Sequence, residues 1–299
     1  MKIGFSSLVC PGWDLDRIIT SASEMGFDGV ELRGLRGELH LPLVGELAGK
    51  PDQVRQLFRD RNVELVCLGT SATLSSKKRT EVNTNKAAVA EFIELAGKLG
   101  CPYVRIFVGE VQKRDNPRAA LARVARELSS LVPGLERSNV TLLVENGGDF
   151  PGSQEMWFLI DALAHPLVKC CWNQCHAMAL RERPTNSIPR LGNNIGLVHL
   201  CDALVDEYGL LREYTPLGKG DVEIAKQIEL LRGLLYDRYL IFEWPKLWIE
   251  SLPPPEEVLP NVAGFLRERL NEKQTILAAY KGDKHAPKLA PRQPIPSGG

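Results

Sequence analysis

The sequence predicts an α/β fold, a (β/α)8 TIM barrel with a Pro-rich C-terminal tail. Eight short apolar runs recur between residues 2 and 244, and segments with helical spacing separate most of them. The runs are apolar nearly throughout, which is typical of parallel strands buried on both faces. No GxGxxG or GxxxxGK[ST] motif follows the first run. This absence disfavours a doubly wound nucleotide-binding sheet, so the barrel is the better interpretation.

The predicted strands cover residues 2–8, 29–34, 63–69, 103–109, 140–146, 168–173, 195–201 and 239–244. Helix signals lie between them. Asp14 can cap a helix that ends at Gly26, and Pro51 suits the first turn of the next helix. Gly100 follows a helical pattern over residues 82–99 as a stop signal. Further helices are predicted over residues 117–131, 153–163, 221–235 and 255–270.

Two segments depart from this alternation. Pro184 and Pro189 interrupt residues 177–194, so only short helical pieces are expected there. The barrel is predicted to occupy residues 1–275, and residues 276–299 form a tail rich in proline and basic residues that cannot bury a core of its own. A solvated terminus is the default for such a tail, and an arm on a neighbouring subunit is the alternative.

Composition excludes several classes of function. The 299 residues contain 37 Lys and Arg and 37 Asp and Glu, so there is no excess positive charge to bind nucleic acid. No run of 18 apolar residues predicts a membrane span, and the N-terminus is a poor signal peptide. The seven cysteines include no CxxC pair and lie mostly in apolar runs, which indicates reduced thiols. A cytoplasmic protein is therefore expected.

Polar side chains close several of the predicted strands, at the end of the barrel where chemistry is expected. They are Glu31, Arg33, Arg105, Glu145, Asn173, His176, His199, Asp202 and Glu243. Taken singly, each could be a salt-bridged strand end, a core histidine or a helix cap. Because four neighbouring strands each contribute a Glu, Asn or His at one height of the barrel, we expect these side chains to converge. Such a mixed oxygen and nitrogen set suits one Mn²⁺, Co²⁺, Mg²⁺ or Zn²⁺ ion.

The chain also resembles the xylose isomerase-like barrel superfamily, the sugar phosphate isomerase and epimerase group, through residue 272 or so. The motifs that carry the resemblance are KIGFSS, GFDGVELR, GCPYVRIFVG, LLVEN, WNQCH, VHLCD, PLGKGDVE and FEW. The resemblance implies that Glu145, Asn173, His199 and Glu243 bind one divalent metal ion. Glu145 and Glu243 would also be the acid/base pair. Members of this group often form dimers or tetramers, so a homo-oligomer is implied.

Substrate contacts are implied for His176, Arg105 and Asp202. Lys219 of PLGKGD stands where family members more often have an acidic or amide residue. Its cation could meet a substrate carboxylate or phosphate, or it could be an ordinary surface lysine. Asn173 stands where the family usually has Asp. An amide oxygen can still bind a hard cation, but the site loses one negative charge.

The expected activity is isomerisation or epimerisation of a sugar or polyol derivative. One carboxylate removes a proton next to a carbonyl group, and the metal stabilises the resulting enediolate. A dehydratase or lyase that uses the same first step is one alternative. A non-catalytic barrel, whose metal site is weakened by Asn173, is another. The variant Asn173→Asp discriminates, because a gain in metal affinity and turnover would indicate a decayed site. Endonuclease activity is disfavoured, because GTSA and GEVQ follow strands three and four without histidine.

Overall fold

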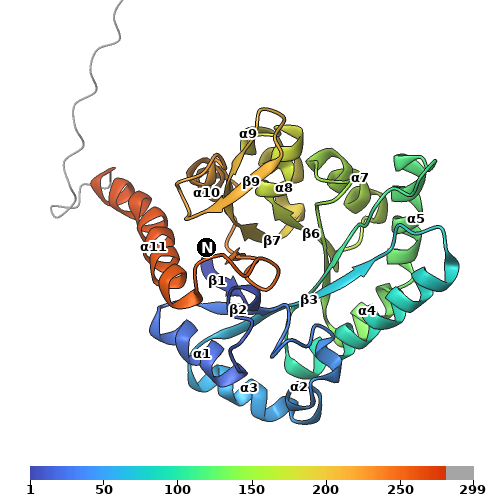
Figure 1. Ribbon diagram of the computed structural model, residues 1–299, viewed down its shortest axis with the longest axis horizontal. Helices are drawn as coiled ribbons and strands as arrows, with labels where there is room; N and C mark the ends of the chain where they lie inside the picture. The colour runs from blue at the N-terminus through green and yellow to red at the C-terminus, as the bar shows by residue number, and fades with distance from the viewer. Residues whose placement is uncertain (281–299) are drawn as a thin grey trace, which may run out of the picture.

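The eight predicted strands form a closed parallel barrel in the computed structural model, which describes residues 1–280. Strand β1 pairs with both β2 and β10, and this pairing closes the barrel. Figure 1 shows β1 and β2 side by side inside the ring of helices. The order around the barrel is β1, β10, β7, β6, β5, β4, β3 and β2. The barrel strands are β1 Lys2–Ser6, β2 Gly29–Leu32, β3 Glu64–Thr73, β4 Tyr103–Phe107, β5 Thr141–Glu145, β6 Val168–Asn173, β7 Ile195–Leu200 and β10 Tyr239–Phe242.

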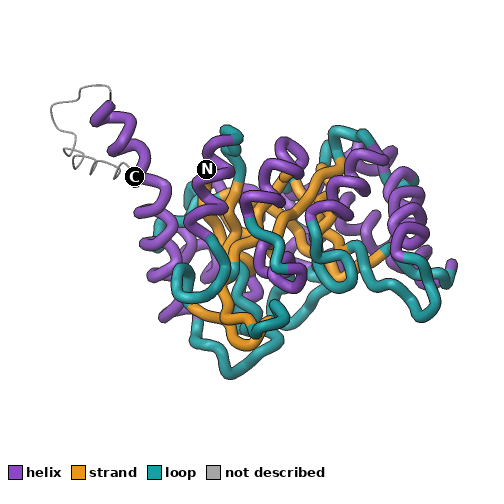
Figure 2. The backbone as a smooth tube through the Cα atoms, turned by 90° about the horizontal axis from the view of Figure 1, so that it is seen from above, coloured by secondary structure: helices purple, strands orange, loops and turns teal. Residues whose placement is uncertain are grey.

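Helices surround these strands, and the longer loops gather at one end of the barrel (Figure 2). The α-helices are α1 Leu15–Glu24, α2 Gly45–Gly49, α3 Pro51–Asp60, α4 Arg79–Leu99, α5 Pro117–Ser129, α6 Val132–Ser138, α7 Ser153–Leu163, α8 Gln174–Ala177, α9 Pro184–Leu191, α10 Ile224–Gly233 and α11 Pro255–Tyr280. Short 3-10 helices are η1 Ser7–Val9, η2 Leu41–Leu43, η3 Met178–Leu180 and η4 Gly192–Asn194. None of the helices in this part of the chain is long and apolar enough to cross a membrane.

Helix ends follow the sequence signals closely. The Asp14 carboxylate accepts the backbone N–H of Arg17 at the start of α1, and Gly100 takes the left-handed conformation that ends α4. Helix α9 keeps Pro189 inside its eight residues, so the segment is short but helical. Helix α11 continues beyond residue 275, the predicted end of the barrel, and residues 281–299 lie outside the described structure.

One element was absent from the sequence prediction. Strands β8 (Asp202–Val205) and β9 (Leu211–Thr215) form an antiparallel hairpin directly after β7. The Asp202 carboxylate stabilises the hairpin and the loop that follows it. It accepts hydrogen bonds from the backbone N–H groups of Ala203, Gly218, Lys219, Gly220 and Val222. Most of β9 is exposed, so the segment lacks the apolar run by which the barrel strands were predicted.

Side chains along each strand alternate between the barrel interior and the surrounding helices, and this alternation determines where the site lies. A layer of apolar residues fills the barrel interior, made by Val66, Cys67, Leu143, Cys171, Leu197, Tyr239 and Ile241. Because alternate residues of a strand point to the same side, the residue two positions later faces the interior one layer higher. Leu143 is thus followed by Glu145, Leu197 by His199, and Ile241 by Glu243. The apolar layer forms a floor, and the polar residues lie at the mouth above it.

Candidate active site

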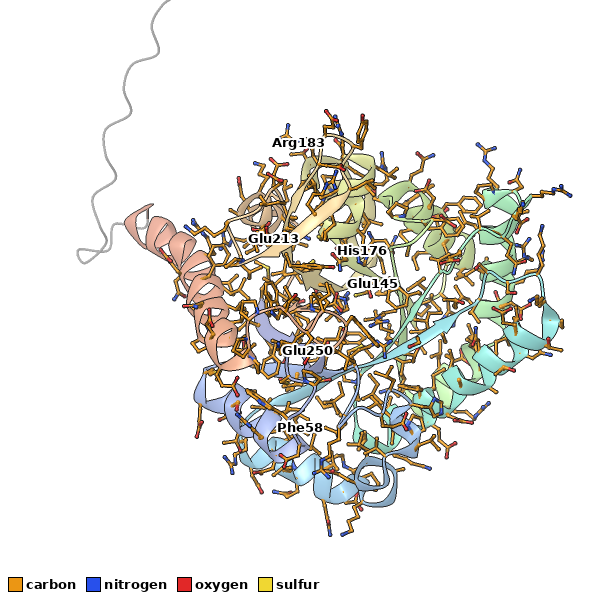
Figure 3. The ribbon with its side chains drawn as sticks, viewed as in Figure 1. Phe58, Glu145, His176, Arg183, Glu213 and Glu250 are labelled. Atoms are coloured by element: carbon orange, nitrogen blue, oxygen red, sulfur yellow. The ribbon has the colours of Figure 1, made fainter. Side chains whose placement is uncertain are left out.

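Four strand ends bring carboxylates, an imidazole and an amide together at the barrel mouth. The Nδ1 atom of His199 on β7 lies 3.0 Å from Glu145 Oε1 and 3.2 Å from Glu243 Oε2. Glu145, Asn173 and His199 are buried, and Glu243 is the most accessible of the four. Figure 3 shows Glu145 inside the ring of helices with His176 beside it. The sequence-predicted ligand residues therefore do converge.

Glu31 on β2 joins this group from across the barrel. Its Oε2 lies 2.9 Å from His199 Nε2, and the Ser6 hydroxyl donates to its Oε1 at 3.0 Å. The sequence marks Glu31 as a polar residue in a buried strand, but neither the motifs nor the resemblance assigned it a role. The only signal was its position at a strand end. Both nitrogens of His199 thus face carboxylate oxygens.

These contacts set the charge of the buried groups. Burial acts to lower the pKa of His199, but the negative groups around it, including Glu243, Glu145 and Glu31, raise that pKa well above its usual value. Burial acts to raise the pKa of Glu145, but His199 and Arg105 outweigh it and hold that pKa well below its usual range. The pKa of Glu31 is lowered in the same way by His199. Glu145 and Glu31 are therefore ionised at neutral pH.

Arg105 on β4 supplies the cation next to Glu145. Its Nε lies 3.0 Å from Glu145 Oε2, and both side chains are 1% exposed. The N–H does not point at the oxygen, so this is a charge contact and not a directed hydrogen bond. The Arg105 Nη1 donates to the Thr70 carbonyl at 2.7 Å, and the guanidinium lies 4.3 Å from the centre of the Phe107 ring. Arg105 is held from three sides, as part of the site wall.

Asn173 on β6 presents its amide nitrogen to the carboxylates. Its Nδ2 lies 3.2 Å from Glu145 Oε1 and 3.1 Å from Glu243 Oε2. Its Oδ1 accepts the backbone N–H of Cys175 at 3.1 Å, as a cap of the short helix α8. Because an N–H donor needs an oxygen acceptor, the Cys175 contact determines which end of the amide faces the site. Asn173 therefore acts as a donor between the two carboxylates.

The predicted substrate residues have different surroundings. His176 is partly exposed at the rim, and its Nδ1 lies 2.7 Å from the Asn146 carbonyl oxygen and 3.9 Å from Glu145 Oε1. Asp202 is buried, and its carboxylate is occupied by the backbone amides of the hairpin and the loop after it. Lys219 is exposed in that same loop, and its backbone N–H donates to Asp202. Of these three, only His176 lies next to the carboxylates.

The family follows from comparison with known proteins. A model of the xylose isomerase-like TIM barrel matches residues 19–269. The chain belongs to the xylose isomerase-like TIM barrel family. No curated protein sequence matches it significantly.

Three solved structures illustrate the similarity of fold. An L-ribulose 3-epimerase is 17% identical, with a TM-score of 0.75 over 96% of this chain and 99% of that one. A D-tagatose 3-epimerase-like protein is 19% identical, with a TM-score of 0.75 over 93% of this chain and 100% of the other. A probable 3-DHS dehydratase from Bacillus anthracis is 17% identical, with a TM-score of 0.73 over 89% and 99%. At these identities the likeness shows the fold alone.

The barrel mouth of this family member has suitable ligands for a divalent cation. Glu31, His199 and Glu243 each offer one ligand atom, and these atoms lie within 4.8 Å of one another, as do those of Glu145, Cys171 and His199. Burial raises the pKa of the Cys171 thiol to about 12, so carboxylate and imidazole donors are the better set. Glu145, His199 and Glu243 fit a hard or borderline cation. Asn173 could ligate only after its amide turned and gave up the Cys175 contact.

Proposed function

We propose that this protein is a sugar isomerase or epimerase that moves a proton next to a carbonyl group. The observation that carries the proposal is the pairing of Glu145 and Glu243, whose oxygens share His199 Nδ1 and Asn173 Nδ2 as neighbours. Two carboxylates from different strands, fixed around one small space, can act on a substrate as base and acid. One breaks the C–H bond beside the carbonyl group, and the other delivers a proton to the resulting enediolate.

The residues around the two carboxylates are consistent with these acid and base roles. His199 and Arg105 keep Glu145 ionised, which is the form that a proton acceptor must have. His176 at the rim and Arg105 in the wall are placed to orient substrate oxygens. Asp202 organises the hairpin loop, so its contribution is to shape the mouth. Lys219 lies on that loop and is exposed, where it could reach a substrate from outside.

We further propose that one divalent ion, Mn²⁺, Co²⁺, Mg²⁺ or Zn²⁺, is held by Glu145, His199 and Glu243. When bound, it would polarise the substrate carbonyl and stabilise developing negative charge. His199 must release its proton to bind a metal, so binding is expected to weaken as pH falls. Asn173 completes the set only with its amide reversed.

A dehydratase is the alternative at the same site, because it would remove the same proton and then expel a β-hydroxyl group. A non-catalytic barrel is the third possibility, since Asn173 already donates to both carboxylates where a cation would lie. Product identification separates the isomerase from the dehydratase. The two experiments below distinguish an enzyme, whether isomerase or dehydratase, from a non-catalytic barrel.

The first experiment measures proton exchange. Ketopentoses and ketohexoses are incubated with the protein in D2O, and deuterium next to the carbonyl group is followed by NMR. Because Glu243 is one of the two acid/base groups, Glu243→Gln is expected to lower the exchange rate by about 10²–10⁴-fold. Glu250→Gln, on an exposed residue of the following loop, is the matched control and should retain the parent rate. Retention of most activity in Glu243→Gln would disprove the assignment of Glu145 and Glu243 as the acid/base pair.

The second experiment measures metal content. After dialysis against trace divalent metals, elemental analysis is expected to find on the order of one equivalent in the parent and little in His199→Ala. The variant Asn173→Asp adds a carboxylate and should tighten Mn²⁺ binding by at least about tenfold in calorimetry. Absence of metal from the parent would instead leave His199 and Arg105 as the cations that balance the carboxylates, with Asn173 as a neutral donor between them.

A further inference from the structure

Arg33 is a buried cation that lacks a carboxylate partner. It follows β2 two residues after Glu31 and is 5% exposed. Its Nη2 donates to the Ser71 hydroxyl at 2.5 Å, whereas its Nη1 is buried without a hydrogen-bond acceptor in the described structure. Among the side chains of residues 1–271, no ion pair shorter than 4.0 Å involves it. A buried guanidinium in this state is costly, because the charge loses water and gains little in return.

Its position is at the mouth, beside the site already described. A methyl group built on Gly69 of β3 would lie 2.8 Å from Arg33 Cδ, 3.0 Å from Arg105 Nη2 and 3.4 Å from Glu31 Oε1. The two arginines thus lie side by side over this glycine. The centre of the Trp248 ring lies 6.0 Å from Arg33 Cζ, and Trp248 is 56% exposed.

The nearby carboxylates are already engaged by other groups. Glu31 contacts Ser6 and His199, and Glu145 contacts Arg105 and His199. Burial and the neighbouring Arg105 lower the pKa of Arg33 to about 10, which still leaves it charged at neutral pH. Arg105 is therefore paired with Glu145, whereas the adjacent Arg33 has no carboxylate partner and keeps Nη1 without an acceptor.

We propose that Nη1 of Arg33 binds an anionic group on the substrate, a carboxylate or a phosphate, so that the substrate is an acidic sugar derivative. The inference rests on the proposed function only in naming the ligand as the substrate. A carboxylate or phosphate oxygen supplies both the missing acceptor and the missing countercharge, and a guanidinium offers the planar donors that these anions match. A water molecule would supply the acceptor but not the charge.

The test compares ligands that differ by one charge. Calorimetry measures the affinity of the full chain for D-gluconate, for the neutral polyol D-glucitol and for inorganic phosphate. We expect gluconate to bind at least tenfold more tightly than glucitol to the parent. Arg33→Gln should abolish this preference while leaving glucitol affinity unchanged. Phosphate competing with gluconate would indicate that the same subsite accepts both anions, and gluconate binding alone would indicate a carboxylate subsite.

Two further variants keep the interpretation specific. Arg36→Gln removes an exposed cation from the same loop and should retain the preference for gluconate. Arg33→Lys keeps the charge but loses the planar fork, so we expect an intermediate preference. Equal affinities of the parent for gluconate and glucitol, or a preference that survives Arg33→Gln, would overturn the proposal.

The outcome is separable from that of the proposed function. Exchange of protons on neutral ketoses without any preference for an anion would disprove the Arg33 subsite and leave the acid/base pair intact. An Arg33-dependent preference for gluconate, with no proton exchange on any ketose or keto-acid tested, would support the subsite and disprove the isomerase.

Discussion

The two sides of the barrel mouth differ in how completely their charges are paired. On the acid side, formed by β5, β6, β7 and the end of β10, each of Glu145, Asn173, His199 and Glu243 contacts at least two others. On the guanidinium side, formed by β2, β3 and β4, Arg105 is paired with Glu145 but Arg33 is not. A paired cluster holds its own geometry, whereas an unpaired buried charge indicates a place for a ligand.

The largest expected difference is in stability. Arg105→Met would leave Glu145 buried beside two other carboxylates, and we expect the free energy of unfolding to fall by about 3–5 kcal/mol. In Arg33→Met every buried carboxylate keeps its cation, so the free energy of unfolding should fall by less than about 1 kcal/mol. Urea unfolding of both variants measures the difference. Similar losses for the two would mean that Arg33 has a structural partner and that the two arginines are equivalent.

A smaller effect is expected from filling the space between the arginines. In Gly69→Ala the new methyl group would press on Arg33 and Arg105, at an expected cost of about 1–3 kcal/mol. Gly12→Ala is the control, because a methyl group there meets nothing within 4 Å. Thermal unfolding compares the two variants, and gluconate binding is expected to weaken only in Gly69→Ala. An unchanged Gly69→Ala protein would show that the arginines can move apart freely.

The smallest effect is the pH dependence of stability, which should come from His199, Glu145 and Glu31 and not from the two arginines. The folded state raises the pKa of His199 above the usual 6.5, so stability should fall as pH rises past that value, where the unfolded chain releases its proton first. The pKa values of Glu145 and Glu31 are lowered, so stability should also fall below about pH 4.5. Each proton contributes at most about 1.4 kcal/mol per pH unit.

Chemical unfolding of the metal-free protein, with EDTA present, between pH 3 and 9 measures this profile. The alkaline decline should be smaller in His199→Gln, which cannot hold the extra proton. Arg33→Met should keep the profile of the parent, because the guanidinium does not titrate in this range. A parent stability that stays level from pH 6.5 to 8.5 would show that His199 is neutral in the folded protein.

Much of the site was predictable because strand ends have a regular geometry. Apolar runs predicted all eight barrel strands, and the polar residues that close them include Glu145, Asn173, His199 and Glu243. The hairpin of β8 and β9 was not predicted, because its strands are short and partly exposed and the turn depends on Asp202. That carboxylate binds amides up to twenty residues away in sequence, a contact without any local pattern.

The sequence by itself determined the strands, the helices between them and the polar residues at the strand ends, because alternation and capping are local properties of the chain. Only the tertiary structure decided which of those residues meet. Closure of the barrel by β1 brought Glu31 to the Nε2 atom of His199, and a contact with Cys175 turned the amide of Asn173 toward the carboxylates. Parallel packing of three neighbouring strands left Arg33 buried beside Arg105. Such arrangements depend on strand register and closure, which no short stretch of sequence encodes.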